Sequence, residues 1–471
     1  MTRPDFLQLD AGAAEPLYRQ IYTRFRNAIA EGLLQPGVRI PAARALALEL
    51  GLARGTVESA YALLTAEGYV ETRGQAGTIV TPALVTHAAV ATAKPPADPV
   101  RALTGSPTSH SRPFQMGLPA LDAFPRKVWA RLAARAVRAT QAEDMVYPPY
   151  PGLPALRTAI ATYLQLSRGI NCAPSQVFVT SGYRNTMELI TRALLRPGDG
   201  VWVEDPGYPP TGALLKEAGM NVVPVGVDGD GIMVSHGIAA APAARAAVVT
   251  PAHQSPLCVS LSLPRRLALL EWAAQQEAWI VEDDYDGEYR YVSRPLPALQ
   301  SLDREGRVLY AGTFSKVLMP AARLAYLVVP EAQVERFDHI SQTFAGGGPT
   351  LMQHIVTDFM NEGHFARHIQ RMRRLYAERR QIAADALTEV LGRHFHIEPQ
   401  PGGMHMVLRM AGHHTDRALA ERMRNDGLSA HALSAFTVLP DAGSGLLLSF
   451  TNIDTRARGR ELARRILRLL P

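Results

Sequence analysis

The chain has 471 residues, which is more than a single hydrophobic core usually accommodates, so we expect two or three domains. Its 47% hydrophobic and 20% charged residues are typical of a globular protein, and no run of eighteen apolar residues is present that could span a membrane. The chain has only two cysteines, which excludes a disulfide scaffold and a cysteine-rich zinc site, and we expect no metal. Together with the absence of an apolar signal segment, this predicts a cytoplasmic protein. The net charge of +6 permits nucleic-acid binding without requiring it.

Residues 15–80 show the pattern of three helices followed by a hairpin. Leu17, Ile21, Phe25 and Ile29 recur at helical spacing, and glycines and prolines mark the breaks between segments. This order predicts an α+β winged helix-turn-helix, whose third helix enters the major groove of double-stranded DNA. The expected elements are helices over 16–31, 41–50 and 54–67, then strands over 69–72 and 78–80 around the tip 73–77.

The segment PLYRQIYTRFRNAIAEGLLQPGVRIPAARALALELGLARGTVESAYALLTAEGYVETRGQAGT resembles the GntR family of bacterial regulators. The resemblance implies a DNA-binding domain over 14–81 and an operator as partner. The residues that it places on DNA are Arg44, Arg54, Thr56, Arg73 and Gly74. Arg54 and Thr56 also lie at the start of the third predicted helix, where contacts to base edges and phosphates belong.

Four residues of this segment depart from the family pattern. Ala42 and Ala43 stand where serines are usual, and Ala53 lacks the hydroxyl that usually caps the third helix. A missing N-cap costs about 0.5–2 kcal/mol, and the absent hydroxyls remove phosphate contacts. Glu58 faces the side where some relatives carry a basic residue. We therefore expect weak or altered affinity for DNA.

The composition changes over 82–113, where alanine, proline, threonine and serine dominate and no periodicity remains, so this segment is predicted to be a flexible linker. Residues 114–471 then alternate short apolar runs with helical segments. Polar residues follow each run, for example Ser181-Gly182-Tyr183 and Glu204-Asp205-Pro206-Gly207-Tyr208. This alternation predicts an α/β domain with a mostly parallel sheet.

The stretch from Trp279 to Arg323 contains two predicted buried strands and a distinctive set of polar residues after them. Ligands of open α/β sheets bind at the carboxyl ends of the strands. A lysine, a carboxylate, a phenol, an arginine and small hydroxyls are the groups that hold pyridoxal 5'-phosphate. Lys316 is one of only four lysines among 49 lysines and arginines, and arginine cannot replace it as a nucleophile. The residues concerned are Asp283, Tyr285, Thr313, Ser315, Lys316 and Arg323.

Residues 114–471 resemble the fold-type I aminotransferases, with a large domain over about 165–340 and a small domain over about 370–471. The combination with a GntR-type head resembles the MocR/GabR family of regulators, through EDPGYP, EDDYDGEYRY, GTFSKVLMPAARLAYLV, EGHFARHIQRMRRLYAERR and PGGMHMVL. The resemblance implies a Schiff base at Lys316, Asp283 at the ring nitrogen, Tyr285 at the ring oxygen and Tyr208 stacked on the ring. It places the phosphate at Arg323, Thr313 and the backbone of Ser181, Gly182 and Tyr183, and Tyr147 at the cofactor of a second subunit, which implies a homodimer.

Two departures from the aminotransferase pattern concern the ligand. Leu447 falls where an arginine that binds a substrate carboxylate is expected, and leucine cannot replace a guanidinium there. Arg409 or Arg456 is a candidate substitute. Leu257-Cys258 replaces the usual threonine-glycine, so we expect an atypical effector pocket.

Several residues have an alternative interpretation. Tyr208 could be a core aromatic, and His253 could cap a strand end or bind a ligand. Asp284 and Asp286 are interpreted as solvated or structural. The arginine-rich helix predicted over 363–380 is interpreted as having a solvated face, with an interdomain or DNA contact as the alternative.

We therefore expect a regulator that binds DNA and senses an amine, an amino acid or pyridoxal phosphate itself through an internal aldimine at Lys316. The alternative is an active aminotransferase with a DNA-binding head, and whether the chain is an enzyme is left open. A DNA-binding scaffold that has lost the cofactor conflicts with the set Asp283, Tyr285, Lys316 and Arg323.

Overall fold

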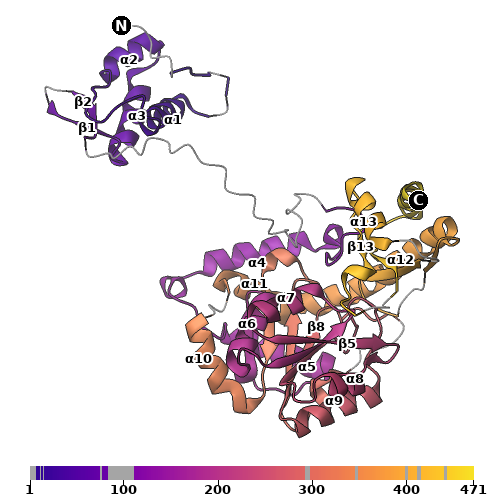
Figure 1. Ribbon diagram of the computed structural model, residues 1–471. Helices are drawn as coiled ribbons and strands as arrows, with labels where there is room; N and C mark the ends of the chain where they lie inside the picture. Colours follow the sequence, from indigo (N-terminus) through magenta and orange to yellow (C-terminus); the bar gives the residue numbers. More distant parts are fainter. Residues whose placement is uncertain are drawn as a thin grey trace. The chain divides into compact units, whose positions relative to one another are not determined.

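The chain divides into two compact units, Met1–Pro107 and Thr108–Pro471 (Figure 1). The predicted linker 82–113, apart from Pro82 and residues 111–113, lies outside the residues that the computed structural model describes, as do Gln75 and Ala76 of the hairpin tip. The described residues are 7–10, 12–13, 15–74, 77–82, 111–291, 297–344, 348–397, 401–410, 415–439 and 443–470.

The N-terminal unit contains three helices and a two-stranded hairpin, in the order expected from the sequence. Phe25, Val57 and Leu64 are fully buried between the helices, and the ring of Phe25 packs edge-on against Tyr61 with 5.6 Å between centroids. The strands pair antiparallel, with Val70 opposite Val80. The elements are α1 (Leu17–Ala30), α2 (Ala43–Leu50), α3 (Arg54–Ala66), β1 (Val70–Thr72) and β2 (Thr78–Val80).

The C-terminal unit is built on an eight-stranded sheet of order β3-β10-β9-β8-β7-β4-β5-β6. Strands β9, β8, β7, β4 and β5 are parallel neighbours, whereas β10 is antiparallel to β3 and β9, and β6 is antiparallel to β5. The prediction of a mostly parallel sheet is confirmed. The strands are β3 (Val177–Thr180), β4 (Gly200–Asp205), β5 (Asn221–Asp228), β6 (Gly231–Ile232), β7 (Ala246–Val249), β8 (Trp279–Asp284), β9 (Val308–Thr313) and β10 (Ala325–Val328).

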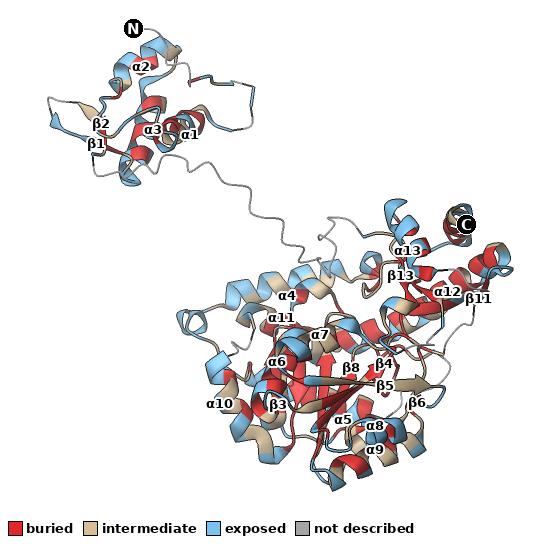
Figure 2. Cartoon of the chain, in the orientation of Figure 1, coloured by how far each residue is buried: buried red, intermediate tan, exposed pale blue. Residues whose placement is uncertain are grey.

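Both faces of this sheet are covered, which explains why its strands read as continuous apolar runs. In β7, Ala246 and Val248 pack with α6, α7 and α10, while Ala247 and Val249 pack with α8 and α9 on the other face. Figure 2 shows the central strands as buried. The helices are α4 (Arg126–Ala139), α5 (Pro154–Arg168), α6 (Tyr183–Leu194), α7 (Pro209–Glu217), α8 (Val234–Ala240), α9 (Leu263–Gln275), α10 (Val334–Phe344) and α11 (Thr350–Asn361).

A four-stranded antiparallel sheet of order β11-β12-β14-β13 follows. One face packs against the helices through Leu408 and Leu446, while Val407 and Leu447 on the other face form a small apolar cluster with Cys258. This second face is therefore turned toward the loop after β7. The elements are α12 (His364–Leu391), β11 (Phe395–Ile397), β12 (His405–Met410), α13 (Asp416–Asn425), β13 (His431–Ala432), β14 (Gly445–Ser449) and α14 (Arg456–Leu469).

The arginines of α12 correct one expectation. Arg379 is buried and ion-paired with Asp122 at 2.5 Å, and Arg373 donates to the backbone oxygen of Glu288 at 2.6 Å. The interpretation as a solvated face is wrong for these residues, because the helix packs against segments distant in sequence that supply oxygen acceptors. No helix within the described residues is both long and apolar enough to cross a membrane.

Candidate cofactor site and nucleic-acid interface

The carboxyl ends of β8 and β9 bring together the acid and the amine that the sequence analysis singled out. The strands are parallel and in a register that places Asp283 beside Ala311, two residues before Thr313. The chain then leaves the sheet and places the half-buried Lys316 so that its Nζ donates to the backbone oxygen of Gly117 at 3.0 Å. Gly117 was not identified from the sequence. A side chain at this position would collide with the amine, since a Cβ there would lie 2.8 Å from Nζ.

Asp283 is buried and its carboxyl makes no hydrogen bond to any residue in the described part of the chain. Burial, with the nearby Asp284 and Glu204, raises the pKa of Asp283 to about 8, against the opposing effect of Lys316. Burial also lowers the pKa of Lys316, although Asp286 and Asp283 oppose that change. A buried carboxyl without a donor suits a cationic N–H such as a protonated pyridine nitrogen, and an amine with a lowered pKa is a better nucleophile.

Tyr285 belongs to a buried group that includes His253 and Asp286. The Nδ1 atom of His253 lies 2.9 Å from the Tyr285 hydroxyl and 3.0 Å from Oδ1 of Asp286. Burial lowers the pKa of His253, but Asp286 and Cys258 raise it well above its usual range. The structure therefore ties His253 to Tyr285 and Asp286 rather than leaving it as a simple strand-end cap. Asp286 is fully buried, so the solvated interpretation of this residue is wrong.

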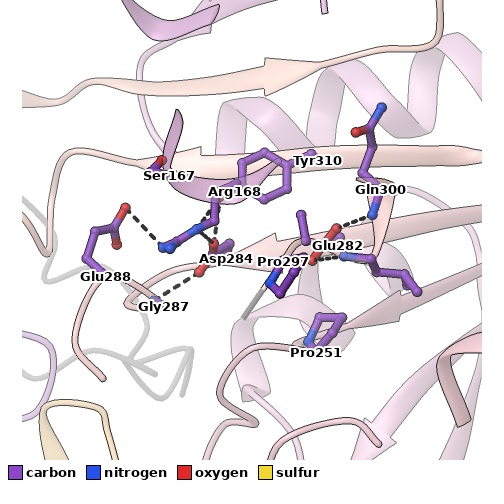
Figure 3. A network of polar contacts seen from close by, with 12 residues as sticks. Ser167, Arg168, Pro251, Glu282, Asp284, Gly287, Glu288, Pro297, Gln300 and Tyr310 are labelled. Carbon is purple, nitrogen blue, oxygen red and sulfur yellow. Dashed lines mark hydrogen bonds and ion pairs between the residues drawn. The ribbon is translucent and has the colours of Figure 1, made fainter. Parts of the chain in front are cut away.

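Asp284 is likewise buried, at the centre of a polar network that holds the end of β8 (Figure 3). Its carboxylate accepts from Arg168 Nε and from the Tyr310 hydroxyl, each at 2.6 Å, and from the backbone N–H of Gly287 at 2.9 Å. Arg168 also lies 3.3 Å from Glu288. Asp284 is therefore structural and unsolvated. Sequence reasoning missed Arg168, which ends the distant helix α5.

A second cluster lies at the start of α6. Gly182 has a φ of 123° and precedes the helix, whose first backbone N–H groups lack partners within the helix. The exposed guanidinium of Arg323 lies beside Gly182. A Cβ added to Gly182 would be 3.5 Å from the guanidinium carbon. Among the described residues Arg323 has no ion-pair partner. A helix N-terminus next to a free guanidinium is suited to a phosphate.

The other residues assigned to the phosphate and ring make contacts of their own. The backbone N–H of Ser181 donates to Asn185 Oδ1 at 3.1 Å, and the Tyr183 hydroxyl lies 2.7 Å from Thr211 Oγ1. Thr313 Oγ1 accepts from the backbone N–H of Ser315 at 3.1 Å. Tyr208 is 46% exposed, with its ring 6.0 Å from that of Tyr183, so the alternative of a core aromatic is wrong. Tyr147 is 93% exposed, and the structure does not bring it into this group.

Leu447 is fully buried against Cys258, Val407 and Leu433. The two arginines considered as substitutes lie elsewhere. Arg456 is ion-paired with Glu389 at 3.3 Å at the surface of α12, and Arg409 is exposed near the end of β12. The wall of the site on this side is thus apolar.

The five residues assigned to DNA lie in the N-terminal unit. Arg44, Arg54 and Arg73 are exposed, and Gly74 has a positive φ of 49°. Two of the arginines are already paired, Arg54 with Glu58 at 2.7 Å and Arg73 with Glu71 at 2.6 Å. Thr56 lies in the first turn of α3, and neither Ala42 nor Ala53 caps its helix with a side chain. The altered affinity for DNA stays a prediction.

Two family models match the chain. Residues 118–456 match the aminotransferases of class I and II, and residues 17–80 match the gntR family of bacterial regulatory proteins. The chain is 36% identical to the probable rhizopine catabolism regulatory protein MocR of Rhizobium meliloti, over 96% of this chain and 93% of that protein. It is 32% identical to the HTH-type pyridoxine biosynthesis transcriptional regulator PdxR of Corynebacterium glutamicum, over 92% of each.

Among solved structures, an archaeal alanine:glyoxylate aminotransferase superposes with a TM-score of 0.71 at 25% identity, covering 76% of this chain and 90% of that one. The alpha-aminoadipate aminotransferase LysN of Thermus thermophilus, solved with a phosphopyridoxyl-leucine, has a TM-score of 0.68 at 27% identity, covering 76% and 91%. The fold of the C-terminal unit is therefore that of the fold-type I aminotransferases.

Proposed function

Because this chain belongs to the MocR-type family of transcriptional regulators, in which a GntR-type winged helix precedes an aminotransferase-like domain, we propose that it binds pyridoxal phosphate and uses it to sense an amine. The proposed DNA-binding domain is 14–81, and the proposed sensor is 114–471. The observation that carries the proposal is the juxtaposition of Asp283, a buried carboxyl without a donor, with the amine of Lys316.

The residues present fit the cofactor, and each has a distinct task. Pyridoxal phosphate supplies an aldehyde that reacts with amines and a protonated ring that withdraws electrons. Lys316 would provide the amine that captures it, and Asp283 would keep a proton on the ring nitrogen. Tyr285 would donate to the ring oxygen, and Tyr208 would cover a ring face. Arg323, with the start of α6, would neutralise the phosphate.

Regulation requires that the effector bind two arrangements of the molecule with different affinity. We propose an amine, an amino acid or pyridoxal phosphate as the effector and a homodimer as the DNA-binding species. Support for a second copy comes from the neighbouring exposed side chains of Met145, Val146 and Tyr147, since contiguous exposed apolar residues often mark interfaces.

The test is covalent capture. Purified protein is mixed with excess pyridoxal phosphate, reduced with borohydride and digested, and the peptides are weighed. The expected result is added cofactor mass on the peptide containing Lys316. The matched control is Lys216→Ala, which removes an exposed lysine of α7 and should leave that mass in place. Absence of the added mass in the wild-type protein would contradict the proposal.

The alternative is a working aminotransferase that carries a DNA-binding head. Its substrate carboxylate would have to lie beside Leu447, whose apolar cluster contains no lysine or arginine. Steady turnover of an amino donor with a keto acid would support this alternative over sensing alone.

A further inference from the structure

The C-terminal unit contains a hollow of about 120 Å³, and none of the residues assigned to the cofactor lines it. The hollow lies between the start of α4, the end of α11 and the beginning of α12. Its apolar wall consists of Pro125, Val128 and Phe359. An apolar cavity of about 150 Å³ is large enough to hold benzene, so a hollow of this size suits a single ring or a short hydrocarbon.

The remaining wall is formed by four side chains of α12, namely His364, Arg367, His368 and Arg371. The last three follow His364 by three, four and seven positions, and this spacing places all four on one face of the helix. The hollow therefore combines an apolar wall with two guanidinium groups.

The charges of these two arginines are not neutralised by any carboxylate in the described part of the chain. Arg367 donates from one nitrogen to the backbone oxygen of Glu362 at 2.8 Å and to Nδ1 of His364 at 3.0 Å. Arg371 donates to the backbone oxygen of Ala123 at 2.9 Å. All three acceptors are neutral, so these contacts orient the guanidinium groups and leave their positive charge uncompensated.

The acidic side chains nearest to the hollow already pair with arginines of α4. Glu362 forms an ion pair with Arg135 and lies 3.8 Å from Arg131. Asp358 pairs with Arg135 at 2.6 Å. Because α4 supplies these partners, Arg367 and Arg371 give the hollow a net positive charge that an anion could neutralise.

His368 contributes an aromatic face rather than a third charge. Its Nε2 donates to the backbone oxygen of Val317 at 2.9 Å, since a carbonyl oxygen can only accept. Burial lowers the pKa of His368, and Arg371 lowers it further, although the bond to Val317 opposes the change. The ring is therefore neutral near pH 7, and it packs edge-on against Phe124 with 5.9 Å between centroids. Val317 follows Lys316 directly, so His368 lies between the hollow and the segment that carries the reactive amine.

We propose that this hollow is a second ligand site, which binds a small carboxylate with a compact apolar body. A guanidinium group matches the two oxygens of a carboxylate, while the apolar wall and the neutral ring of His368 accept the hydrocarbon part. Ligand sites generally combine an apolar lining with a few polar groups that fix the orientation of the ligand. The site is separate from Lys316, and this inference does not rest on the proposed function.

The first test measures the binding of benzoate to the full-length protein by titration calorimetry. We expect saturable binding that Arg367→Met weakens by at least about tenfold, because methionine keeps an unbranched apolar stem but loses the charged hydrogen bonds. The matched control is Arg374→Met. It makes the same change in net charge at an exposed position of α12 outside the hollow, and it should keep the wild-type affinity. Equal affinities of wild type and Arg367→Met, or no saturable binding, overturn the proposal.

The second test separates the two parts of the ligand. Benzyl alcohol has the ring without the charge, and acetate has the charge without the ring, so each should bind at least about tenfold more weakly than benzoate. Val128→Phe fills the hollow without a change in charge and should weaken benzoate binding to a similar extent. An equal affinity for benzyl alcohol overturns the requirement for an anion, and an equal affinity for acetate overturns the requirement for an apolar body.

The third test locates the bound ligand. The imidazole signals of histidine-labelled protein are followed by nuclear magnetic resonance during the addition of benzoate, whose ring current shifts nearby protons. We expect the signals of His364 and His368 to move, and the variants His364→Gln and His368→Gln identify them. Movement of the signal of His253 instead would place benzoate beside Tyr285, at the proposed cofactor site, and would overturn the assignment of a separate site.

Discussion

Arg168, at the end of α5, donates from its Nε atom to the carboxylate of Asp284 over 2.6 Å, and both side chains are almost completely buried. The pair joins α5 to the end of β8 within the C-terminal unit, one residue beyond Asp283. Buried pairs of this kind contribute more to the definite position of an element than to net stability, because desolvation offsets the attraction. Breaking one partner, however, leaves the other as an unpaired buried charge.

Arg168→Met should therefore lower the free energy of unfolding of the C-terminal unit by about 3–5 kcal/mol. The four tryptophans, Trp129, Trp202, Trp272 and Trp279, all lie in this unit, so their fluorescence during urea denaturation reports on it alone. The control is Arg135→Met. Arg135 pairs with Asp358 at the surface, where water and salt screen the attraction, so its replacement should lower the free energy of unfolding far less than Arg168→Met does. Equal losses in the two variants would contradict the assignment of a structural role to Arg168.

The raised pKa of Asp283 predicts how stability depends on pH in the unloaded protein. Its pKa is about 8 when folded and about 3.9 in an unfolded chain, so the folded state binds the extra proton. The stabilisation from this group is fully present below pH ~4 and is lost as pH rises through about 8. Asp283→Asn cannot lose that proton.

Between pH 5 and pH 8, the free energy of unfolding of wild type should therefore fall by at least about 1.4 kcal/mol more than that of Asp283→Asn. This amount is the equivalent of one pKa unit. Using the difference removes most of the contribution of other buried carboxyls such as Glu282, whose pKa burial also raises to about 7. A difference that stays constant over this range would show that Asp283 ionises normally.

Leu447 predicts which effectors the site accepts. A carboxylate placed against the apolar cluster of Leu447, Val407 and Cys258 would be desolvated without a lysine or arginine to pair with. An amine should therefore shift the spectrum of the bound cofactor at a concentration at least about tenfold lower than the α-amino acid with the same side chain.

Leu447→Arg should reduce or reverse this preference, because a guanidinium pairs with a carboxylate. The control is Leu446→Met, which lies on the opposite face of β14 and should keep the wild-type ratio. Equal responses of wild type to both ligands would mean that another cation reaches the site.

We expect Glu58 to weaken the binding of DNA. It pairs with Arg54 at 2.7 Å on the exposed face of α3 and adds a negative charge where phosphates would approach. Glu58→Gln should tighten binding to duplex DNA and increase the salt dependence of the affinity by up to about one phosphate contact. The control is Glu31→Gln, which makes the same change in net charge at the end of α1. The same gain in DNA affinity in both variants would show that only the net charge of the protein matters, and not the position of Glu58.

The local pattern of the chain predicted most of the elements and the chemistry of individual residues. The helical spacing of Leu17, Ile21 and Phe25 predicts α1 to within about a residue of its observed bounds. Gly51 predicts the end of α2 equally closely. Both signals are local properties of the chain. Lys316 and Asp283 could be singled out because polar residues that follow buried parallel strands necessarily meet at one edge of the sheet.

Contacts between segments distant in sequence were decided by the tertiary structure alone. Arg168 and Asp284 are 116 residues apart, and Cys258 and His405 are 147 apart. No periodicity relates such residues, and the pKa of each depends on which partner the packing delivers and on how much water it excludes. The sequence by itself therefore determined which groups could do chemistry, whereas only the fold decided that Asp286 is buried, that Cys258 faces an imidazole and that Leu447 lies in an apolar wall.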